Sequence, residues 1–89
     1  MNKKMIEILA CPIDKHSPLE IFESTSNGDR IIEGALYCIE CTRFYPIIEE
    51  IPIMLPDDLR DKNKEMDFLN KNQKKLPEKI IKNASPWHL

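Results

Sequence analysis

The chain has 89 residues, of which 42% are hydrophobic and 31% charged, and its formal net charge is −2. This length allows one domain with a thin core, which a metal site or a partner protein commonly stabilises. The net charge argues against general attraction to nucleic acid, and no apolar run approaches the ~20 residues of a membrane span. The apolar start is interrupted by Glu7 and is too short for a secretory signal, so we expect a cytoplasmic protein.

The first half of the chain predicts a short helix followed by an antiparallel sheet of about four strands. Asn2 can cap a helix over residues 2–9, in which Met5, Ile6 and Leu9 share one side. A dense turn signal at residues 24–29 contains Asn27-Gly28, a pair that favours a tight hairpin. Alternating or apolar runs predict strands on both sides of this turn and after Cys41, at residues 19–23, 31–37, 44–48 and 51–55.

The second part of the chain predicts a helix and a packed tail. Pro56 followed by two acidic residues is typical of a helix start, and apolar residues recur at helical spacing until Pro77: Leu59, Met66, Leu69 and Leu76. We expect the lysines between Lys62 and Lys82 to form a solvated helix face, and Trp87 and Leu89 to pack into the core. The resulting fold is α+β, with a ribbon-like core at residues 1–56. This core bears two candidate metal-binding turns, residues 11–14 and 38–41, which we call the first and second knuckles. The helix and tail of residues 57–89 pack on this core within a single domain.

Two turns of equal spacing predict a metal site. Cys38 and Cys41 form a CxxC motif, and Cys11 and Asp14 repeat that spacing with a carboxylate in the second position. Two such turns separated by a hairpin are the zinc-ribbon arrangement, in which four ligands close a tetrahedron around one zinc ion. The candidate zinc ligands are therefore Cys11, Asp14, Cys38 and Cys41.

Other readings of the cysteines stay open. His16 is a rival fourth ligand, although it requires a different turn. The site can also have lost its metal, which would make the cysteines small buried hydrophobes. Redox use of Cys38 and Cys41 is a further alternative, but thioredoxin-like motifs belong to longer βαβ folds. A catalytic metal requires an open coordination position on a scaffold that can hold a substrate, and the chain has no second cluster of His or carboxylates.

The apolar run at residues 51–55 predicts a surface that needs a cover. Ile51, Ile53 and Leu55 would lie on one face of a strand and Met54 on the other, so both faces are apolar. Pro52 confines this strand to a sheet edge, because proline cannot donate a hydrogen bond to the ladder. Either a partner protein pairs with this edge, or the helix after Pro56 folds back over it, or both cover part of it.

The segments at residues 5–12, 15–20, 34–38, 43–48 and 51–56 resemble the tRNA methyltransferase activator subunit family in its short archaeal form. The resemblance covers residues 5–60 and the ending from Leu76 onward. It implies a subunit without catalytic residues that forms a heterodimer with class I, S-adenosylmethionine-dependent methyltransferases of tRNA, ribosomal RNA or a translation release factor. It also implies docking by strand pairing, which agrees with the edge argument.

By the family's motifs, the docking segments are residues 44–48 and 51–55, with part of the first knuckle nearby. The implied contact residues are Leu9, Ala10, Pro12, Phe44, Tyr45, Pro46, Ile47, Ile51, Pro52, Ile53, Met54 and Leu55. This chain departs from the family at Asp14, where zinc-binding members have Cys, and at Glu50, where Gly is usual before Ile-Pro. The alternative function is a free-standing zinc ribbon that binds RNA or a transcription or translation complex. It predicts a basic hairpin, whereas residues 19–37 hold four acidic residues and one arginine.

Overall fold

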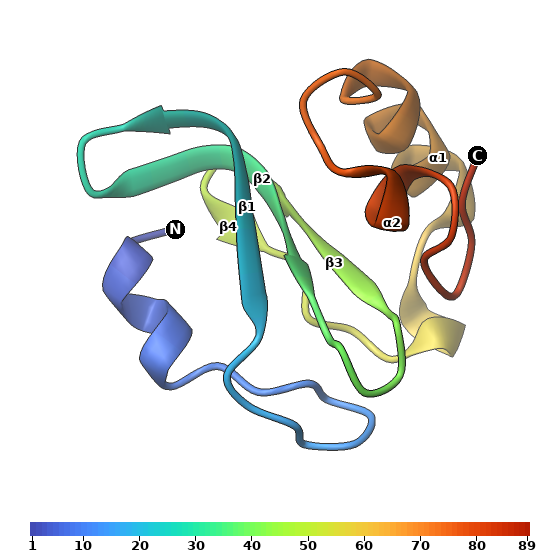
Figure 1. Ribbon diagram of the computed structural model, residues 1–89, viewed down its shortest axis with the longest axis horizontal. Helices are drawn as coiled ribbons and strands as arrows, with labels where there is room; N and C mark the ends of the chain where they lie inside the picture. The colour runs from blue at the N-terminus through green and yellow to red at the C-terminus, as the bar shows by residue number, and fades with distance from the viewer.

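The computed structural model describes residues 1–89 and confirms the predicted α+β fold with a four-stranded antiparallel sheet. The sheet has the order β1-β2-β3-β4, with each strand beside its neighbour in sequence (Figure 1). Two 3₁₀ helices and two α-helices surround it. In chain order the elements are η1 (Lys3–Glu7), β1 (Glu20–Asn27), β2 (Arg30–Tyr37), β3 (Phe44–Ile48), β4 (Ile51–Pro52), η2 (Asp57–Leu59), α1 (Lys62–Lys71) and α2 (Glu78–Ile81).

The first helix and the first hairpin follow from local sequence. The Asn2 side chain accepts a hydrogen bond from the Lys4 N–H at 2.9 Å, so it caps η1 as predicted. The β1–β2 turn is tighter than predicted, because Asn27 still pairs with Arg30 and only two residues form the loop. Gly28 adopts the left-handed conformation, with φ of +62°, that such a turn requires.

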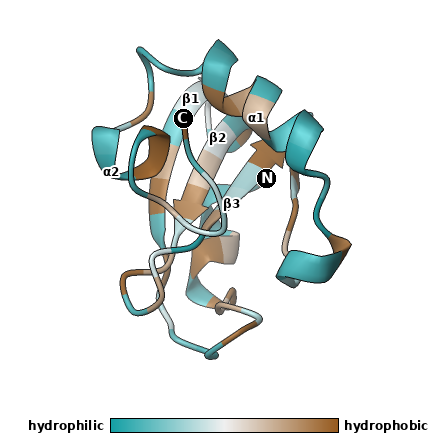
Figure 2. Ribbon diagram, turned by 90° about the vertical axis from the view of Figure 1, so that its right-hand side faces the viewer, coloured by the Kyte–Doolittle hydropathy of each residue, from teal (hydrophilic) through white to brown (hydrophobic).

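Both faces of the sheet are covered. Consecutive residues of β2 and β3 alternate between two buried clusters, as the pleat requires. One cluster lies under α1, α2 and the tail: Ala35, Tyr37, Phe44, Phe68, Leu69, Leu76, Ile80, Ile81 and Ala84. The other lies between the sheet, η1 and the cysteine turns: Met1, Cys11, Leu19, Ile31, Leu36, Cys38, Tyr45 and Ile47. Figure 1 shows α1, α2 and the tail on one side of the strands, and Figure 2 views the molecule from that side, with these segments in front of the sheet.

The helical region after Pro56 differs from the single helix that the spacing predicts. It is divided into η2, α1 and α2, and Pro77 precedes α2 instead of ending a longer helix. Arg60 leaves the helical path with ψ of 143°, and its buried side chain donates to the Phe44 carbonyl. The Asp61 side chain then caps α1 by accepting from the Lys64 N–H. The prediction was wrong here because a tertiary contact of Arg60 overrides helical periodicity.

The edge strand is also shorter than predicted. Only Ile51 and Pro52 form β4, although the Ile53 N–H still donates to the Pro46 carbonyl at 2.8 Å.

Trp87 and Leu89 of the tail pack against the cluster under α1 and α2, as predicted. No helix of the structure is both long and apolar enough to cross a membrane.

Candidate metal centre and docking edge

The two cysteine turns have the same backbone geometry. The Lys15 N–H donates to the Cys11 carbonyl at 2.8 Å, and the Thr42 N–H donates to the Cys38 carbonyl at 2.9 Å. Lys15 and Thr42 both adopt a φ of +62°. Each turn therefore bends back on itself over five residues and directs its two ligand side chains to one point, as zinc-ribbon spacing requires.

All four predicted metal ligands come together. Their ligand atoms lie within 4.8 Å of one another. The Cys11 and Cys41 sulfurs are 3.7 Å apart, and the Cys38 sulfur lies 3.5 Å and 3.6 Å from the two Asp14 oxygens. A tetrahedral zinc ion with Zn–S bonds of about 2.3 Å places two sulfurs about 3.8 Å apart, and a sulfur and an oxygen about 3.5 Å apart. The donor set of three sulfurs and one oxygen thus fits tetrahedral zinc in chemistry and spacing.

His16 lies outside this group. Its backbone N–H donates to Asp14 Oδ1 at 2.9 Å, and its ring Nδ1 lies 3.8 Å from a Glu40 oxygen. The His16 N–H is also the main cause that holds the pKa of Asp14 below its ordinary value. Of the two candidates for the fourth ligand, Asp14 and not His16 lies beside the cysteines. Its ionised carboxylate is suited to bind a cation.

Burial raises the pKa of the Cys38 thiol to about 12. Burial also acts to raise the pKa of the Cys11 thiol. Hydrogen bonds with the Tyr45 hydroxyl and with the backbone of Asp14 and Ile13 outweigh this effect of burial, so the pKa of Cys11 is lowered. A divalent cation among these groups would stabilise the thiolates against the cost of burial, because metal ligation requires the deprotonated form.

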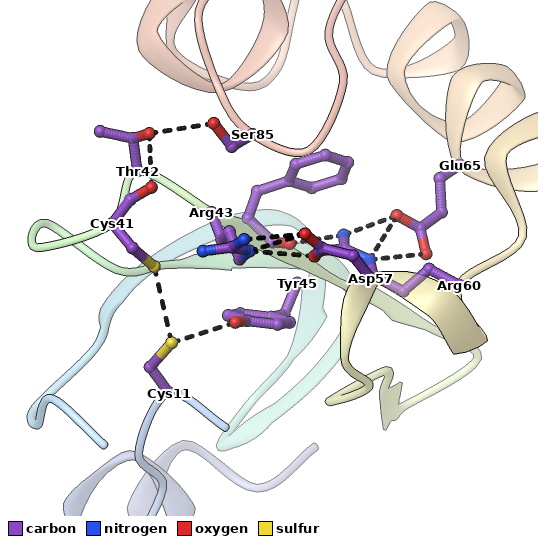
Figure 3. A network of polar contacts seen from close by, with 10 residues as sticks. Cys11, Cys41, Thr42, Arg43, Tyr45, Asp57, Arg60, Glu65 and Ser85 are labelled. Atoms are coloured by element: carbon purple, nitrogen blue, oxygen red, sulfur yellow. Dashed lines mark hydrogen bonds and ion pairs between the residues drawn. The ribbon is translucent and has the colours of Figure 1, made fainter. Parts of the chain in front are cut away.

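Side chains outside the ligand set connect the centre to the rest of the fold (Figure 3). The Tyr45 hydroxyl of β3 lies 3.1 Å from the Cys11 sulfur. After the second turn, Arg43 forms a bidentate ion pair with Asp57 of η2, with its shortest contact at 2.8 Å. The Ser85 N–H donates to the Thr42 carbonyl at 2.8 Å. The second knuckle is therefore held by both η2 and the tail.

A buried arginine lies beneath this network. The Arg60 side chain is fully buried, donates to Glu65 and to the Phe44 carbonyl, and lies over the rings of Phe44, Tyr45 and Trp87. The Arg60–Glu65 pair fixes the start of α1 against β3. Sequence reasoning missed this pair, because the spacing of charged residues on a predicted surface helix does not reveal which of them is buried.

The second candidate site is an apolar hollow of about 370 Å³ beside the sheet edge. It lies between the β3–β4 hairpin, η2 and the start of α1. Three large apolar side chains remain exposed at its border: Ile51 is 60%, Leu55 37% and Leu59 64% exposed. The hollow is lined by Pro46, Ile48, Glu49, Ile51, Ile53, Leu55, Leu59, Asp61, Lys64 and Glu65. The spacing placed Leu59 in a helix that packs on the core, whereas it lies exposed in η2 at this border, which corrects that prediction.

The other predicted contact residues have different surroundings. Phe44, Tyr45 and Ile47 are fully buried in this chain, so their side chains are unavailable to a partner in this conformation. Met54 is half-buried and packs against the cluster near the cysteines, as does Leu9. Ala10 and Pro12 are exposed at the first knuckle. Pro52 pairs with Ile47 at the outermost position of the sheet.

Comparison with known proteins places these features in a family context. The family model for Trm112p-like proteins matches residues 2–50. UPF0434 proteins from Nitrosococcus oceani and Methylobacillus flagellatus are 37% and 40% identical to this chain over 60 residues. That span is 67% of this chain and 86% and 85% of theirs.

A solved structure is similar in both sequence and fold. It is the Haloferax volcanii Trm112 methyltransferase activator in complex with a protein classed as a methyltransferase. The two chains are 40% identical and superpose with a TM-score of 0.64, and the match covers 67% of this chain and 100% of that one.

Proposed function

Because the chain belongs to the Trm112p-like family, we propose that it is a non-catalytic activator subunit of methyltransferases. The observation that carries the proposal is the apolar hollow at the sheet edge, where Ile51, Leu55 and Leu59 remain exposed. Three apolar side chains left in water add no burial energy to the stability of this small chain. Grouped exposed apolar residues mark protein interaction sites. The similarity to the Haloferax volcanii activator supports a methyltransferase as the protein that covers them.

The docking mode that we propose is strand addition at β4. Pro52 has no N–H to donate. On the side that faces β3, Pro52 pairs with Ile47 and the Ile53 N–H donates to the Pro46 carbonyl. The outer edge of residues 52–54 is then free to pair with a strand of the enzyme, while apolar enzyme side chains enter the hollow. Leu9, Ala10 and Pro12 of the first knuckle would border this contact.

We propose that the enzymes are class I, S-adenosylmethionine-dependent methyltransferases of tRNA, ribosomal RNA or a release factor, acting in the cytoplasm. Covering an apolar patch of the enzyme would keep it soluble and hold its donor-binding region in an ordered state. In this chain, zinc would have a structural role. Held by Cys11, Asp14, Cys38 and Cys41, it would cross-link the two knuckles that support η1 and β3.

The test is a pull-down of the full chain from native lysate with identification of bound proteins, followed by calorimetry with the enzyme found. Ile51→Lys should weaken binding by about 2 kcal/mol or more, because it places a charge in an apolar contact. Ile39→Lys is the matched control, since Ile39 is 56% exposed at the tip of the second knuckle, away from the hollow. Equal binding by the two variants would reject the docking edge, and recovery of no methyltransferase would reject the function.

A further inference from the structure

The chain separates its charges along its length. Seven lysines and three acidic residues lie between Lys62 and Lys82, whereas the rest of the chain has six basic and twelve acidic residues. The positive segment reaches its highest density at residues 70–75, which contain three lysines and no acid. We call residues 70–75 the lysine turn. The small net charge of the whole chain therefore hides a local positive surface.

The lysine turn forms a hollow with a uniform chemistry. A shallow hollow of about 340 Å³ is lined by Asn70, Lys71, Gln73, Lys74 and Lys75, with no hydrophobic residue among them. Lys71 shares its charge with Glu33 at 3.2 Å, while Lys74 and Lys75 take part in no ion pair. The Gln73 amide donates to the Asn70 side-chain oxygen at 3.0 Å, so the Asn70 amide N–H groups remain available as donors. The hollow thus presents cationic and amide donors to an anion.

The turn is held in place from within. Asn72 is fully buried; its side chain donates to the Phe68 carbonyl at 2.9 Å and accepts from Ser24 of β1 at 2.5 Å. Leu76, at the other end of the turn, is buried in the cluster under α1 and α2. The exposed residues between these two anchors are therefore presented by a fixed backbone. A fixed array of lysines loses less conformational entropy on binding than a flexible tail does.

The position of the turn suits a ligand that extends beyond this chain. The proposed docking hollow is lined by Lys64 and Glu65 in the first turn of α1, and the lysine turn lies at the opposite end of that helix. The helical rise from Glu65 to Lys71 is about 9 Å. In Figure 1 the orange turn between α1 and α2 lies at the top of the molecule, away from the yellow η2 beside the hollow. The docking hollow and the lysine turn therefore lie at opposite ends of α1.

We infer that the lysine turn is a binding surface for the phosphate backbone of the RNA on which the docked methyltransferase acts. The inference rests on the proposed function for the identity of that RNA, but the phosphate-binding surface itself is a property of this chain. Lysine binds phosphate as a point charge, and the backbone of a nucleic acid offers a series of phosphates to this cluster of three lysines. An anionic membrane is disfavoured, because the hollow has no apolar side chain to enter the lipid.

The test is a titration of labelled bulk tRNA with the complex of this chain and its co-purifying enzyme. The triple change Lys71→Gln, Lys74→Gln and Lys75→Gln should weaken RNA binding about tenfold at about 0.1 M salt, and should reduce the slope of log affinity against log salt by about two. The matched control is Lys4→Gln, Lys62→Gln and Lys82→Gln, which removes the same charge elsewhere and should change affinity by less than about twofold.

Gel filtration of both triple variants with the enzyme separates this inference from the proposed function. Weaker RNA binding by an intact complex supports the inference, whereas equal RNA affinity of the two variants overturns it. Binding of the chain to vesicles of anionic phospholipid that the first variant loses, with no effect on RNA, would also overturn it and assign the surface to lipid headgroups. If the wild-type chain forms no complex, the proposed function fails, and the same tRNA titration with the isolated chain decides whether the lysine turn binds phosphate.

Discussion

The Tyr45 hydroxyl lies 3.1 Å from the sulfur of Cys11, so the third strand of the sheet reaches the candidate metal centre. Tyr45 is fully buried, and burial raises its pKa well above the ordinary phenol value, with the Cys11 contact acting in the same direction. The hydroxyl therefore stays protonated and can donate to a Cys11 thiolate. Such a donor orients the sulfur and distributes its charge.

Tyr45→Phe should accordingly weaken zinc binding. Loss of an outer-shell hydrogen bond costs about 10–100-fold in metal affinity. Competition with a chromophoric chelator measures this, with elemental analysis of the wild-type protein establishing the stoichiometry first. Tyr37→Phe is the control, since Tyr37 lies in the cluster under the α-helices and not near the sulfurs. Unchanged zinc affinity in Tyr45→Phe would mean that the hydroxyl has no part in the centre.

Removal of the metal should destabilise the fold. Zinc that binds only the folded state stabilises it by about 4 kcal/mol when its free concentration is 1,000 times the dissociation constant. For a domain of this size each kcal/mol corresponds to about 4–8 °C in Tm. A chelator should therefore lower the Tm of the wild-type protein and have no effect on Cys38→Ala, which has lost a ligand. A wild-type Tm that is the same with and without chelator would contradict a structural zinc.

The buried ion pair of Arg60 and Glu65 should be costly to break on one side only. Arg60→Leu leaves the Glu65 carboxylate buried without a counter-charge, which costs about 3–5 kcal/mol. The double variant Arg60→Leu and Glu65→Leu removes both charges and should recover much of this loss. Urea unfolding of the three proteins measures the difference. A double variant as unstable as the single one would show that packing of Arg60 against the aromatic rings matters more than its charge.

Glu50 holds a backbone conformation that favours glycine. Glu49 and Glu50 have φ values of +49° and +70°, and Glu50 is fixed by its N–H to the Ile32 carbonyl at 2.9 Å and by an ion pair with Arg30. A left-handed conformation costs a non-glycine residue about 1–2 kcal/mol. Glu50→Gly should therefore be more stable than Glu50→Ala by about 1 kcal/mol, since both lose the ion pair and only Gly relieves the strain. Equal thermal unfolding of the two variants would show that the corner is not strained.

The Arg43–Asp57 pair predicts a specific dependence of stability on pH. The hydrogen bonds from Arg43 are the main cause that lowers the pKa of the Asp57 carboxyl. A carboxyl with a depressed folded-state pKa adds stability that is fully present above its unfolded value of about 3.9 and is lost as pH falls through the folded value. Asp57→Asn should cost about 0.5–1 kcal/mol at neutral pH, a small figure because Asp57 is partly exposed and solvent screens the pair.

At pH values below the folded pKa of Asp57, the Asp57→Asn variant and the wild-type protein should converge in stability, since both then lack the charge. Unfolding in urea across the range from about pH 2 to pH 7 spans the ordinary carboxyl pKa and checks this. A difference between the two proteins that stays constant over that range would show that the carboxylate charge is not responsible.

Much of the first half of the fold could be predicted, because its signals are local. The Asn27-Gly28 turn, the alternating runs beside it and the two knuckles each involve residues within a few positions of one another. The backbone geometry of each knuckle spans five residues, so the spacing of Cys11 and Asp14 and of Cys38 and Cys41 is enough to direct their side chains together. The four-stranded sheet follows from these pieces and from the short loops that join them.

The order of the strands and the four residues of the candidate metal centre therefore follow from local patterns in the sequence. The tertiary structure alone decided where the helix after Pro56 breaks, since Arg60 leaves it to bind the Phe44 carbonyl, 16 positions earlier in the chain. It also decided which apolar side chains remain in water. Ile47 and Ile51 look alike in sequence, but one is fully buried and the other is 60% exposed. Burial depends on what packs on each face, and those contacts join residues that no local pattern brings together.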